Sequence, residues 1–556
     1  MSKFYDQEAV LLRILKDKLD PELYEYAVQE LETFYDKCYE EFDPRAVHTD
    51  REGQPKLIKY NRFGDDVSEI WVNEGYQKTV EDTYNAGIVG YVHKPIPELG
   101  RKGNYLYSYA QGYLLSQVEP GFYCPVTLTM AVAYLIDHFA DDHLRETFLP
   151  HVLSTGEVEL YEGATFLTER QGGSDVGANE VKAVQDGDGY RLFGEKYFAS
   201  NAGQCGVAAV LARIEGSEPG TKGLSLFLVP WRKEDGSIND IQVRRLKDKL
   251  GVRAVPSAEI VFEGSRAYLV GDPKKGFYYM MEALNLSRVC NAIASVGIMK
   301  RALKEAHEYA GWREAFGNKI IQYPMVKETL TNLQARYEIQ LSALYELIEM
   351  FDQVMNDRDR VTDEQVAMNR LLIALLKART ADEAIDFSHE AIEMHGGNGY
   401  IEDFVTPRLL RDAQVLTVWE GTANILGLEV LRLIKKYQVH ELFFKKIHQM
   451  LDGSTMDQTW LQPIQKKMKK LQTALQYLQD QDEDAQTYHA KRLANMMTDI
   501  YLAAHAIERA ETERDETIAK LMIDHLFGDY GLDEDMLPVK KFAEIMKPES
   551  KSFVNS

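Results

Sequence analysis

The sequence predicts an α+β fold in which a middle β domain lies between two helical domains and a helical extension follows. Three changes of pattern support this order. Helical periodicity dominates residues 1–158, short β-type segments separated by turn residues fill residues 159–272, and helical periodicity returns over residues 273–440. Residues 441–556 keep a helical pattern and form the extension. We therefore expect four domains with these boundaries.

The N-terminal domain is predicted to be mainly helical. Apolar residues recur at helical spacing over Asp20–Glu41, and they fill most positions of Thr127–His138, which indicates a buried helix. Glycine and proline punctuate two further stretches, Arg45–Lys59 and Lys94–Asn104. We expect both of these stretches to be irregular.

The middle domain is predicted to be a β barrel or sandwich. One of its strands follows the turn Asp186–Gly189, in which aspartate and glycine alternate. The predicted strands are Gly189–Phe198, Val207–Arg213, Leu224–Val229 and Ala258–Phe262.

The third domain is predicted to be a four-helix bundle. In the extension, Met456–Leu526 is strongly helical, with Leu471, Leu475 and Leu478 on one face. We expect this extension to pack on the main body or on a partner subunit. The four bundle helices are predicted at Arg288–Arg313, Pro324–Asn356, Asp363–Gly396 and Thr422–Gln438.

Composition argues against several classes of protein. Hydrophobic residues make up 45% and charged residues 27% of the 556-residue chain, as in an ordinary globular protein. The formal net charge of −23 repels nucleic acids and anionic membranes. The basic run Lys466–Lys470 is most simply a solvated helix face. We therefore expect no nucleic-acid partner.

Targeting and metal-binding patterns are also lacking. The first twenty residues contain no apolar stretch typical of a signal peptide, and no run of about 18 apolar residues occurs. The four cysteines lie far apart and form no Cys-x-x-Cys or Cys/His cluster. We expect a cytoplasmic protein with single thiols, no metal site and no integral membrane segment.

Two local patterns in the β domain suggest a ligand. Leu167–Val176 contains two adjacent glycines before Ser174, which would let backbone N–H groups approach an anion. A simple turn explains this pattern about as well. Gly194–Asn201 places Phe198 and Ser200 at a strand end, where a flat heteroaromatic ring could stack and form a hydrogen bond. Taken alone, an ordinary strand with a polar end is the simpler interpretation.

A third pattern joins a glycine-rich helix end to a carboxylate. Glu393–Tyr400 ends one predicted helix, and Val418–Ile425 opens the next, with Glu420 behind two apolar residues. An apolar setting raises the pKa of a carboxyl group, which suits a base that works near neutral pH. A helix-start carboxylate that interacts with the helix dipole is an equally good interpretation of these residues alone.

Together, the three patterns resemble the acyl-CoA dehydrogenase family. They occur in the family's order over about residues 60–435, and the 23-residue spacing from Gly397 to Glu420 agrees with the family pattern. The sequence Trp-Glu-Gly at Glu420, together with Arg62–Asp66 and Lys247–Gly251, looks most like the branch that contains the adaptive-response protein AidB. The resemblance implies an acyl-CoA dehydrogenase-like fold, with the helical extension added.

The resemblance implies that FAD binds between the β domain and the helical domain. Phe198 and Ser200 match positions against the flavin ring, where tryptophan and threonine are usual. Pro324 and Glu393 stand where the family commonly has glutamine. The positions that match cofactor contacts are Leu167, Thr168, Ser174, Phe198, Ser200, Arg313, Phe316, Glu393, Gly397, Thr422 and Asn424.

The resemblance also implies partners for the chain. In relatives, the segments that match Arg313, Phe316, Glu393 and Gly397 reach FAD held by a neighbouring subunit, so we expect a homodimer or a homotetramer. An electron-transfer flavoprotein is the expected electron acceptor. The positions that match substrate contacts are Ser174, Arg288 and Gly421.

The implied reaction is the α,β-dehydrogenation of an acyl-CoA thioester to a trans-2-enoyl-CoA, as in fatty acid β-oxidation. Glu420 matches the base that removes the pro-R α-proton, while the β-hydrogen leaves as a hydride to flavin N5. Some branches carry the base immediately before the arginine that matches Arg288. This chain has Ser287 there, so Glu420 has no competitor.

Three alternatives remain open. An acyl-CoA oxidase or a nitroalkane oxidase-like enzyme would use oxygen as the acceptor, although nitroalkane oxidases have aspartate at the position of Glu420. An AidB-like flavoprotein with weak dehydrogenase activity and nucleic-acid association would need a basic C-terminal surface, whereas Asp480–Asp484 is acidic. A catalytically silent scaffold on the same fold is disfavoured by the intact Glu420.

Overall fold

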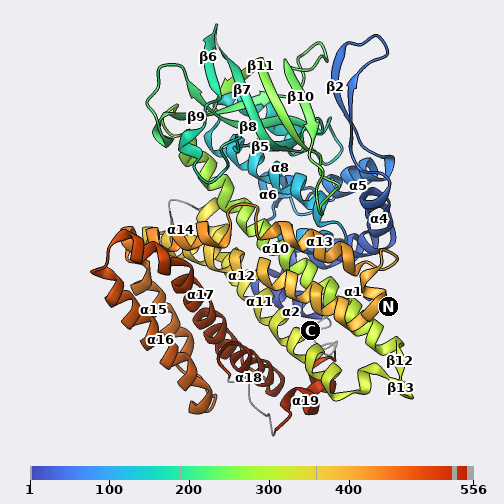
Figure 1. Cartoon of the computed structure of the whole chain (residues 1–556), viewed down its shortest axis with the longest axis vertical. Helices are drawn as coiled ribbons and strands as arrows, with labels where there is room; N and C mark the ends of the chain where they lie inside the picture. Colours follow the sequence, from blue (N-terminus) through green and yellow to red (C-terminus); the bar gives the residue numbers. More distant parts are fainter. Residues whose placement is uncertain (1–2, 188, 358–359, 529–534, 548–556) are drawn as a thin grey trace. The chain divides into compact units, whose positions relative to one another are not determined.

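The computed structural model describes residues 3–187, 189–357, 360–528 and 535–547, which form two compact units (Figure 1). We call Glu25–Cys290 the β unit, and Met1–Tyr24 together with Asn291–Ser556 the helical unit. The long helix α10 (Gly276–Trp312) begins in the β unit and ends in the helical unit. Asp188, in the predicted turn Asp186–Gly189, lies outside the described residues.

The β unit begins with helices that come before the strands of its sheet. Its helices are α3 (Pro21–Lys37), α4 (Asp43–Arg51), α5 (Glu74–Asn85), α6 (Gly90–His93), α7 (Tyr105–Ser116), α8 (Pro120–Phe139) and α9 (Asp142–Val152). Two antiparallel pairs lie among them, β1 (Lys56–Tyr60) with β2 (Asp66–Trp71) and β3 (Pro95–Ile96) with β4 (Arg101–Lys102).

The prediction that Arg45–Lys59 is irregular was wrong. Residues 45–51 belong to α4, and residues 56–59 belong to β1. Pro44 lies in the first turn of α4, where proline is tolerated because the first helical N–H groups have no partner inside the helix. The carbonyl oxygen of His48 then accepts from the backbone N–H groups of Glu52 and Gly53, which ends the helix.

Among the residues that the structure describes, one helix is long and apolar enough to cross a membrane by length and composition alone. This helix is α8, and 83% of its most apolar window is buried inside the structure, as expected for a core helix. It packs on strand β5, where Thr129 Oγ1 accepts from the backbone N–H of Gly163 at 2.8 Å. A Cβ atom at Gly163 would lie 2.8 Å from Thr129 Cα, so the close approach requires glycine.

The seven-stranded sheet of the β unit closes into a barrel (Figure 1). β8 pairs with β9, β9 with β11, β11 with β7, β7 with β6, and β6 again with β8, while β5 and β10 extend the sheet. The β5–β8 and β6–β8 pairs are parallel, and the others are antiparallel. The strands are β5 (Glu162–Phe166), β6 (Lys182–Asp186), β7 (Gly189–Ser200), β8 (Cys205–Ile214), β9 (Leu224–Pro230), β10 (Ile241–Leu246) and β11 (Ser257–Leu269).

Burial along the strands fits a closed barrel. In β10 the buried Ile241 and Val243 lie on either side of the partly buried Gln242. In β7, whose pairing with β11 contains register shifts, buried residues recur every three or four positions, whereas β8 and β9 are almost wholly buried. The predicted β domain is therefore confirmed. The buried side chains that fill it include Phe166, Leu192, Val210, Phe227, Trp231, Val243, Ile260 and Phe262.

The helical unit is built on long helices that pack along much of their length. Helix α12 contacts α11, α13, α14, α15 and α17, while α11 contacts α2, α18 and α19. A short hairpin, β12 (Glu314–Ala315) with β13 (Asn318–Lys319), follows α10. The helices are α1 (Lys3–Gln7), α2 (Ala9–Lys18), α11 (Pro324–Asn356), α12 (Asp363–His395), α13 (Thr406–Leu416), α14 (Ala423–Tyr437), α15 (Val439–Leu451), α16 (Gln458–Gln479), α17 (Glu483–Glu508), α18 (Glu513–Phe527) and α19 (Leu537–Ile545).

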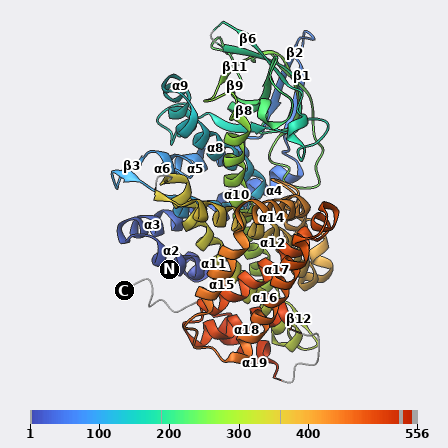
Figure 2. The ribbon, with the colours of Figure 1, turned by 90° about the vertical axis from the view of Figure 1, so that its left-hand side faces the viewer.

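The predicted C-terminal extension is present as α15–α19 and packs on the other helices of its unit. Figure 2 shows α15–α18 side by side, and α17 contacts α14, α15, α16 and α18. Leu471, Leu475 and Leu478 of α16 are buried, as their helical spacing predicts.

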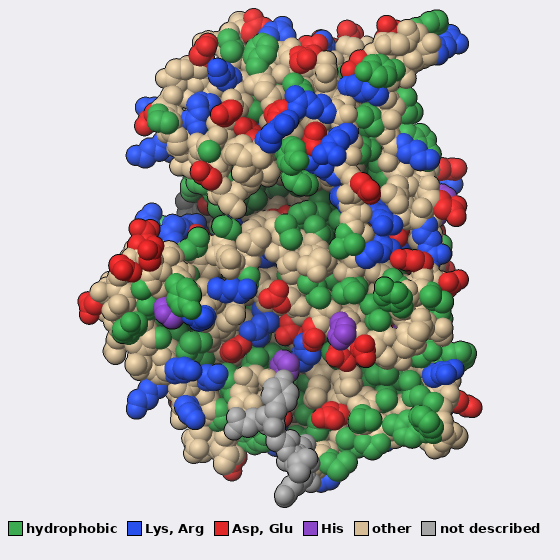
Figure 3. Space-filling view, viewed as in Figure 1, with side chains coloured by type: hydrophobic (Ala, Val, Ile, Leu, Met, Phe, Trp, Pro, Cys, Tyr) green, Lys and Arg blue, Asp and Glu red, His purple; other side chains and the backbone are tan. Residues whose placement is uncertain are grey.

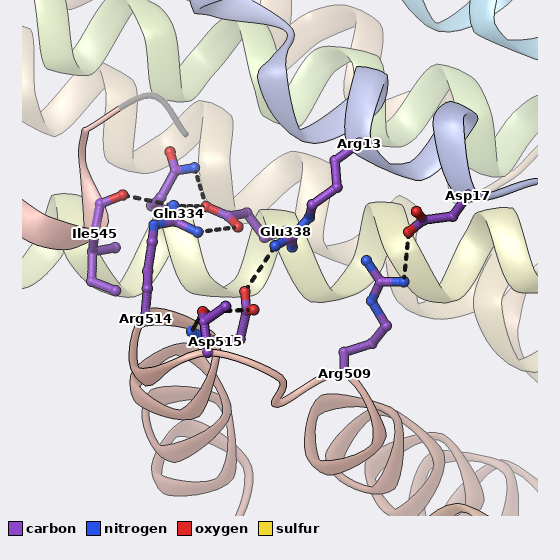
Figure 4. A network of polar contacts seen from close by, with 9 residues as sticks. Arg13, Asp17, Gln334, Glu338, Arg509, Arg514, Asp515 and Ile545 are labelled. Atoms are coloured by element: carbon purple, nitrogen blue, oxygen red, sulfur yellow. Dashed lines mark hydrogen bonds and ion pairs between the residues drawn. The ribbon is translucent and has the colours of Figure 1, made fainter. Parts of the chain in front are cut away.

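Polar contacts join the extension to α2 and α11 (Figure 4). Arg13 of α2 forms a 3.0 Å ion pair with Asp515 of α18, and Arg514 forms hydrogen bonds of 2.5 and 3.0 Å with the buried carboxylate of Glu338 on α11. These contacts link residues up to 502 positions apart in the chain. The extension is therefore part of the folded helical unit.

Candidate active site

Glu420 lies in a sharp turn between α13 and α14. Its φ angle is 56°, in the left-handed region, and Gly421 follows with a φ angle of 107°. A residue with a Cβ atom pays roughly 1–2 kcal/mol for that conformation, so contacts elsewhere must hold the turn. Thr422 is the N-cap residue of α14 but makes no side-chain cap hydrogen bond.

Two side chains from other helices hold this turn. Asn291 of α10 is buried, and its Nδ2 donates to Glu420 Oε2 at 2.9 Å and to the carbonyl oxygen of Leu416 at 3.2 Å. Lys377 of α12 is 1% exposed, and its Nζ donates to the carbonyl oxygen of Gly421 at 2.8 Å. The carboxylate and the backbone of the turn are thus fixed from α10 and α12.

Sequence reasoning missed both Asn291 and Lys377. Asn291 follows Ser287-Arg288, the place where other branches carry their base, by one helical turn. That proximity was the one signal that could have found it. Lys377 lies within a long predicted helix, and nothing in its local pattern separates it from a surface lysine.

The surroundings of Glu420 differ in part from the apolar pocket that its neighbours suggest. Val418 is exposed and Trp419 is half-buried. Thr422 and Asn424, which match FAD-contact positions, are exposed directly after the turn. The polar contacts of the turn therefore come from Asn291 and Lys377 on other helices, while the apolar Val418 beside the turn remains exposed.

In the β unit, the segments Leu167–Val176 and Gly194–Asn201 meet at the end of β7. The backbone N–H of Tyr197 donates to the carbonyl oxygen of Thr168 at 2.9 Å, and Lys196 Nζ donates to that of Leu167 at 3.2 Å. Lys196 also forms a buried 2.7 Å ion pair with Glu169. Leu167 and Thr168 are therefore held beside the strand that carries Phe198.

Phe198 presents an accessible aromatic face. It is 51% exposed, and the ammonium of Lys247 lies 4.7 Å from its ring centroid. Ser200 Oγ lies 3.2 Å from Ser257 Oγ, at the same end of β7 and β11. Figure 3 shows basic side chains gathered over β7, β10 and β11, where Arg244 and Arg245 pair with glutamates.

The glycine pair of the first pattern is structurally required. Gly172 has a φ angle of 113°, and a Cβ atom at Gly173 would lie 2.6 Å from Thr168 Oγ1. Ser174 follows and is exposed.

Arg288, which we expected to contact the substrate, is buried on α10. Its Nη1 donates a hydrogen bond to Asn285 Oδ1 at 3.0 Å.

Two segments expected to reach a neighbouring subunit meet at Tyr309 in the helical unit. The backbone N–H of Arg313 donates to the carbonyl oxygen of Tyr309 at 2.8 Å, and Asn398 Nδ2 donates to the Tyr309 hydroxyl at 3.1 Å. The structure therefore brings the Arg313–Phe316 hairpin and the Glu393–Tyr400 segment together. Arg313, Glu393 and Gly397 are all exposed.

Phe316 forms the tip of this hairpin and is 95% exposed. Its φ angle is 52°, and Gly317 follows with a φ angle of 85°, which together turn the chain. Tyr323 fixes the hairpin by donating from its hydroxyl to the carbonyl oxygen of Ala315 at 2.7 Å. Trp312 and Tyr400 are also largely exposed, so this end of the unit presents aromatic rings to the solvent.

His395 is a packing residue at the end of α12. Its ring stacks on Tyr309 with centroids 4.1 Å apart, and Nδ1 lies 2.7 Å from the carbonyl oxygen of Ala391. Burial lowers the pKa of His395, which favours the neutral ring. These contacts are those of a packing residue at a helix end.

The residues present are compatible with a flavin dinucleotide. A half-exposed aromatic face and hydroxyl groups at the end of β7 suit a flat heteroaromatic ring. The left-handed Gly172 and the exposed Gly397 have nothing within 4 Å of a Cβ position, so their backbone is open to a ligand. The exposed Arg313 suits a pyrophosphate, because a guanidinium forms bidentate hydrogen bonds.

Three family models match successive parts of the chain. Residues 14–156 match the N-terminal domain of the adaptive response protein AidB. Residues 164–265 match the acyl-CoA dehydrogenase middle domain, and residues 274–434 match the acyl-CoA dehydrogenase C-terminal domain.

Relatives and a solved structure extend the match to most of the chain. The chain is 31% identical over 525 residues to acyl-CoA dehydrogenase family member 11 of Caenorhabditis elegans, covering 91% of this chain and 84% of the relative. It is 31% identical over 392 residues to putative acyl-CoA dehydrogenase AidB of Escherichia coli strain K12, covering 69% of each chain. The crystal structure of C. elegans ACDH-11 in complex with C11-CoA matches with a TM-score of 0.86 at 27% identity, covering 96% of this chain and 93% of that one. The chain therefore belongs to the acyl-CoA dehydrogenase family of oxidoreductases, with an AidB-type N-terminal domain.

Proposed function

We propose that this oxidoreductase dehydrogenates an acyl-CoA thioester to a trans-2-enoyl-CoA with bound FAD, and that Glu420 is the base. The main support for this proposal is the turn at Glu420. The backbone of Glu420 adopts a costly left-handed conformation. Asn291 binds the carboxylate of this residue, and Lys377 binds the carbonyl oxygen of the following Gly421. Such pre-organisation suits a group that must meet a substrate C–H bond in one orientation.

The carboxylate of Glu420 accepts the α-proton of the thioester. The α C–H electrons form the new double bond, and the β-hydrogen leaves with its electron pair. When bound, FAD supplies the hydride acceptor at N5. The backbone N–H of Glu420 donates to the thioester oxygen as the enolate develops, and one such donor is typically worth about 2.7–4 kcal/mol.

Residues of the β unit would hold the flavin in this proposal. Phe198 would stack on the ring, Ser200 and Thr168 would donate hydrogen bonds to it, and the backbone at Leu167 would contact its pyrimidine edge. Thr422 and Asn424, exposed directly after the turn at Glu420, match further family positions that contact FAD. Ser174, Arg288 and Gly421 match positions that contact the acyl-CoA.

One relative supports a choice of acyl-CoA substrates for the proposal. ACDH-11, to which the chain is similar, was crystallised with C11-CoA, so acyl-CoA thioesters of medium length are the first candidates for this chain. We propose that an electron-transfer flavoprotein reoxidises the enzyme, in keeping with the family resemblance.

A homo-oligomer is part of the proposal. Phe316, Trp312 and Tyr400 expose large aromatic surfaces at one end of the helical unit, and exposed apolar clusters of this kind favour an interface. A second copy would cover them and bring Arg313 and Phe316 to its FAD. Glu393 and Gly397 lie in the adjoining segment and would reach the same cofactor.

The proposal is tested by purifying the protein with its bound chromophore and titrating it anaerobically with acyl-CoAs of short, medium and long chain length. Loss of the flavin absorbance with a product two mass units lighter than the acyl-CoA is the expected result. Bound FAD that no acyl-CoA reduces would contradict it. Rapid reoxidation of the reduced enzyme by oxygen alone would favour the oxidase alternative.

A further inference from the structure

Asn291 makes the contact that orients the carboxylate of Glu420. Its Nδ2 donates to Glu420 Oε2 at 2.9 Å and to the carbonyl oxygen of Leu416 at 3.2 Å. Both neighbours are acceptors, so the nitrogen of the amide must face them. We propose that Asn291 is the positioning residue that holds Glu420 as an oriented, ionised base; this inference rests on the proposed function of Glu420.

Stability alone does not explain an asparagine at this position. Asn291 is buried, and its Oδ1 has no hydrogen-bond partner among the residues that the structure describes. A buried, unpaired oxygen costs free energy that a leucine of similar volume would not incur. The amide is therefore better explained by what its nitrogen does for the carboxylate.

The hydrogen bond from Asn291 limits the directions that this carboxylate can take. The left-handed turn fixes the Glu420 backbone, but the side chain still has three rotatable bonds. The two oxygens of a carboxylate are rigidly joined, so a donor fixed on Oε2 also sets the direction of Oε1. Since α10 is a long helix, Asn291 offers a rigid anchor for that donor.

The elements packed around the turn carry several charges. Lys377 of α12 is the buried cation that contacts Gly421. Helix α13 carries Arg411, which pairs with Glu402, and the buried Asp412. Helix α14 carries Glu429, paired with Arg370 and Arg432. Helix α10 carries the buried Arg288 three residues before Asn291, and no charged residue lies between Asn291 and Lys300. Among these fixed charges, an amide favours the carboxylate form without adding another charge.

The test compares Asn291→Leu and Asn291→Asp with the wild-type holoenzyme. The first removes the donor, and the second replaces it with a nearly isosteric carboxylate. A matched control is Asn369→Leu, which removes another buried amide, on α12 of the same unit. The readout is the pH dependence of the rate at which an acyl-CoA reduces the flavin anaerobically, together with the melting temperature at pH 7.

Asn291→Leu is expected to move the acid limb of this profile upward by about one pH unit, because a hydrogen bond to the ionised form is lost. Asn291→Asp is expected to move it further, because two neighbouring carboxylates resist ionising together. Asn369→Leu is expected to keep the wild-type profile. Asn291→Ala removes the same donor if either variant does not fold.

Two results would overturn the inference, and they are distinguishable. If the wild type is reduced but the Asn291 variants keep its pH profile and only melt at a lower temperature, Asn291 merely caps α13 through Leu416. If no acyl-CoA reduces the wild type, the proposed function fails and this inference fails with it.

Discussion

The ammonium group of Lys377 donates a 2.8 Å hydrogen bond to the carbonyl oxygen of Gly421, the residue after the proposed base. Burying an ammonium group is costly unless strong contacts offset the loss of hydration. This contact links the left-handed turn to the middle of α12, and it explains why a lysine is buried at this position.

Replacing Lys377 with methionine should therefore loosen the turn. We expect the rate of flavin reduction by an acyl-CoA to fall about a hundredfold, the typical effect of a misplacement of about 1 Å at a reacting group. The matched control is Lys300→Met, which removes another buried ammonium that donates to a backbone carbonyl, that of Gln7 at 2.5 Å. An equal loss in both variants would contradict a specific role for Lys377.

The β unit contains a buried carboxyl group that makes stability depend on pH. Desolvation raises the pKa of Glu162 from 4.5 to about 8, while hydrogen bonds with Tyr84 and Asn201 act in the opposite direction. Since the folded pKa exceeds the unfolded one, the folded state holds this proton over a range in which the unfolded state releases it. Stability is therefore lost as the pH rises from about 4.5 to about 8.

Glu162→Gln should remove this dependence. Relative to the wild type, we expect little difference near pH 4 and a gain of roughly 3–5 kcal/mol in unfolding free energy at pH 8. Denaturant unfolding at several pH values measures it, and the exposed Glu159→Gln serves as the control. A difference between wild type and Glu162→Gln that stays constant with pH would argue against a neutral, buried Glu162.

The network in Figure 4 predicts unequal effects for two acidic residues. The side chain of Glu338 is 3% exposed and bound by Arg514 and Gln334, whereas that of Asp17 is 55% exposed and 3.6 Å from Arg509. We expect Glu338→Gln to cost about 1–3 kcal/mol of stability and Asp17→Asn only a few tenths. Thermal unfolding compares them, and equal effects would contradict a larger contribution from the buried Glu338.

The exposed hairpin tip predicts an interface. Phe316→Ala should lower both the retention of FAD and the mass of the particle in sedimentation, because the ring is expected to reach a neighbouring subunit. Phe63→Ala is the control, since Phe63 also lies at the tip of a hairpin and is 76% exposed. Unchanged FAD content and mass in Phe316→Ala would remove this residue from the interface.

The sequence anticipates regular elements where local chemistry marks their ends. The predicted helix Pro324–Asn356 agrees with α11 at both ends, because proline is favoured in a first helical turn. The predicted helix Arg288–Arg313 begins too late, since α10 starts at Gly276. The aromatic and methionine residues that follow Gly276 blur the helical period on which such predictions depend.

The candidate site was predictable where it is contiguous in sequence. Glu420, Gly421 and Thr422 form one motif, and Phe198 and Ser200 form another, so a family pattern can identify them. Asn291 and Lys377 act on that turn from 129 and 44 residues away in the chain. Contacts of that kind arise from tertiary packing, which no local spacing encodes.

The role of Glu420 as the base is tested most directly by a single anaerobic turnover with an acyl-CoA that reduces the flavin, measured for the wild type, Glu420→Gln and Glu402→Gln. Glu402 is a partly exposed glutamate that pairs with Arg411 in the same unit. We expect rapid loss of the flavin absorbance in the wild type and in Glu402→Gln, and a loss of at least about 10³-fold in rate in Glu420→Gln. Reduction of Glu420→Gln at the wild-type rate would show that another group takes the proton.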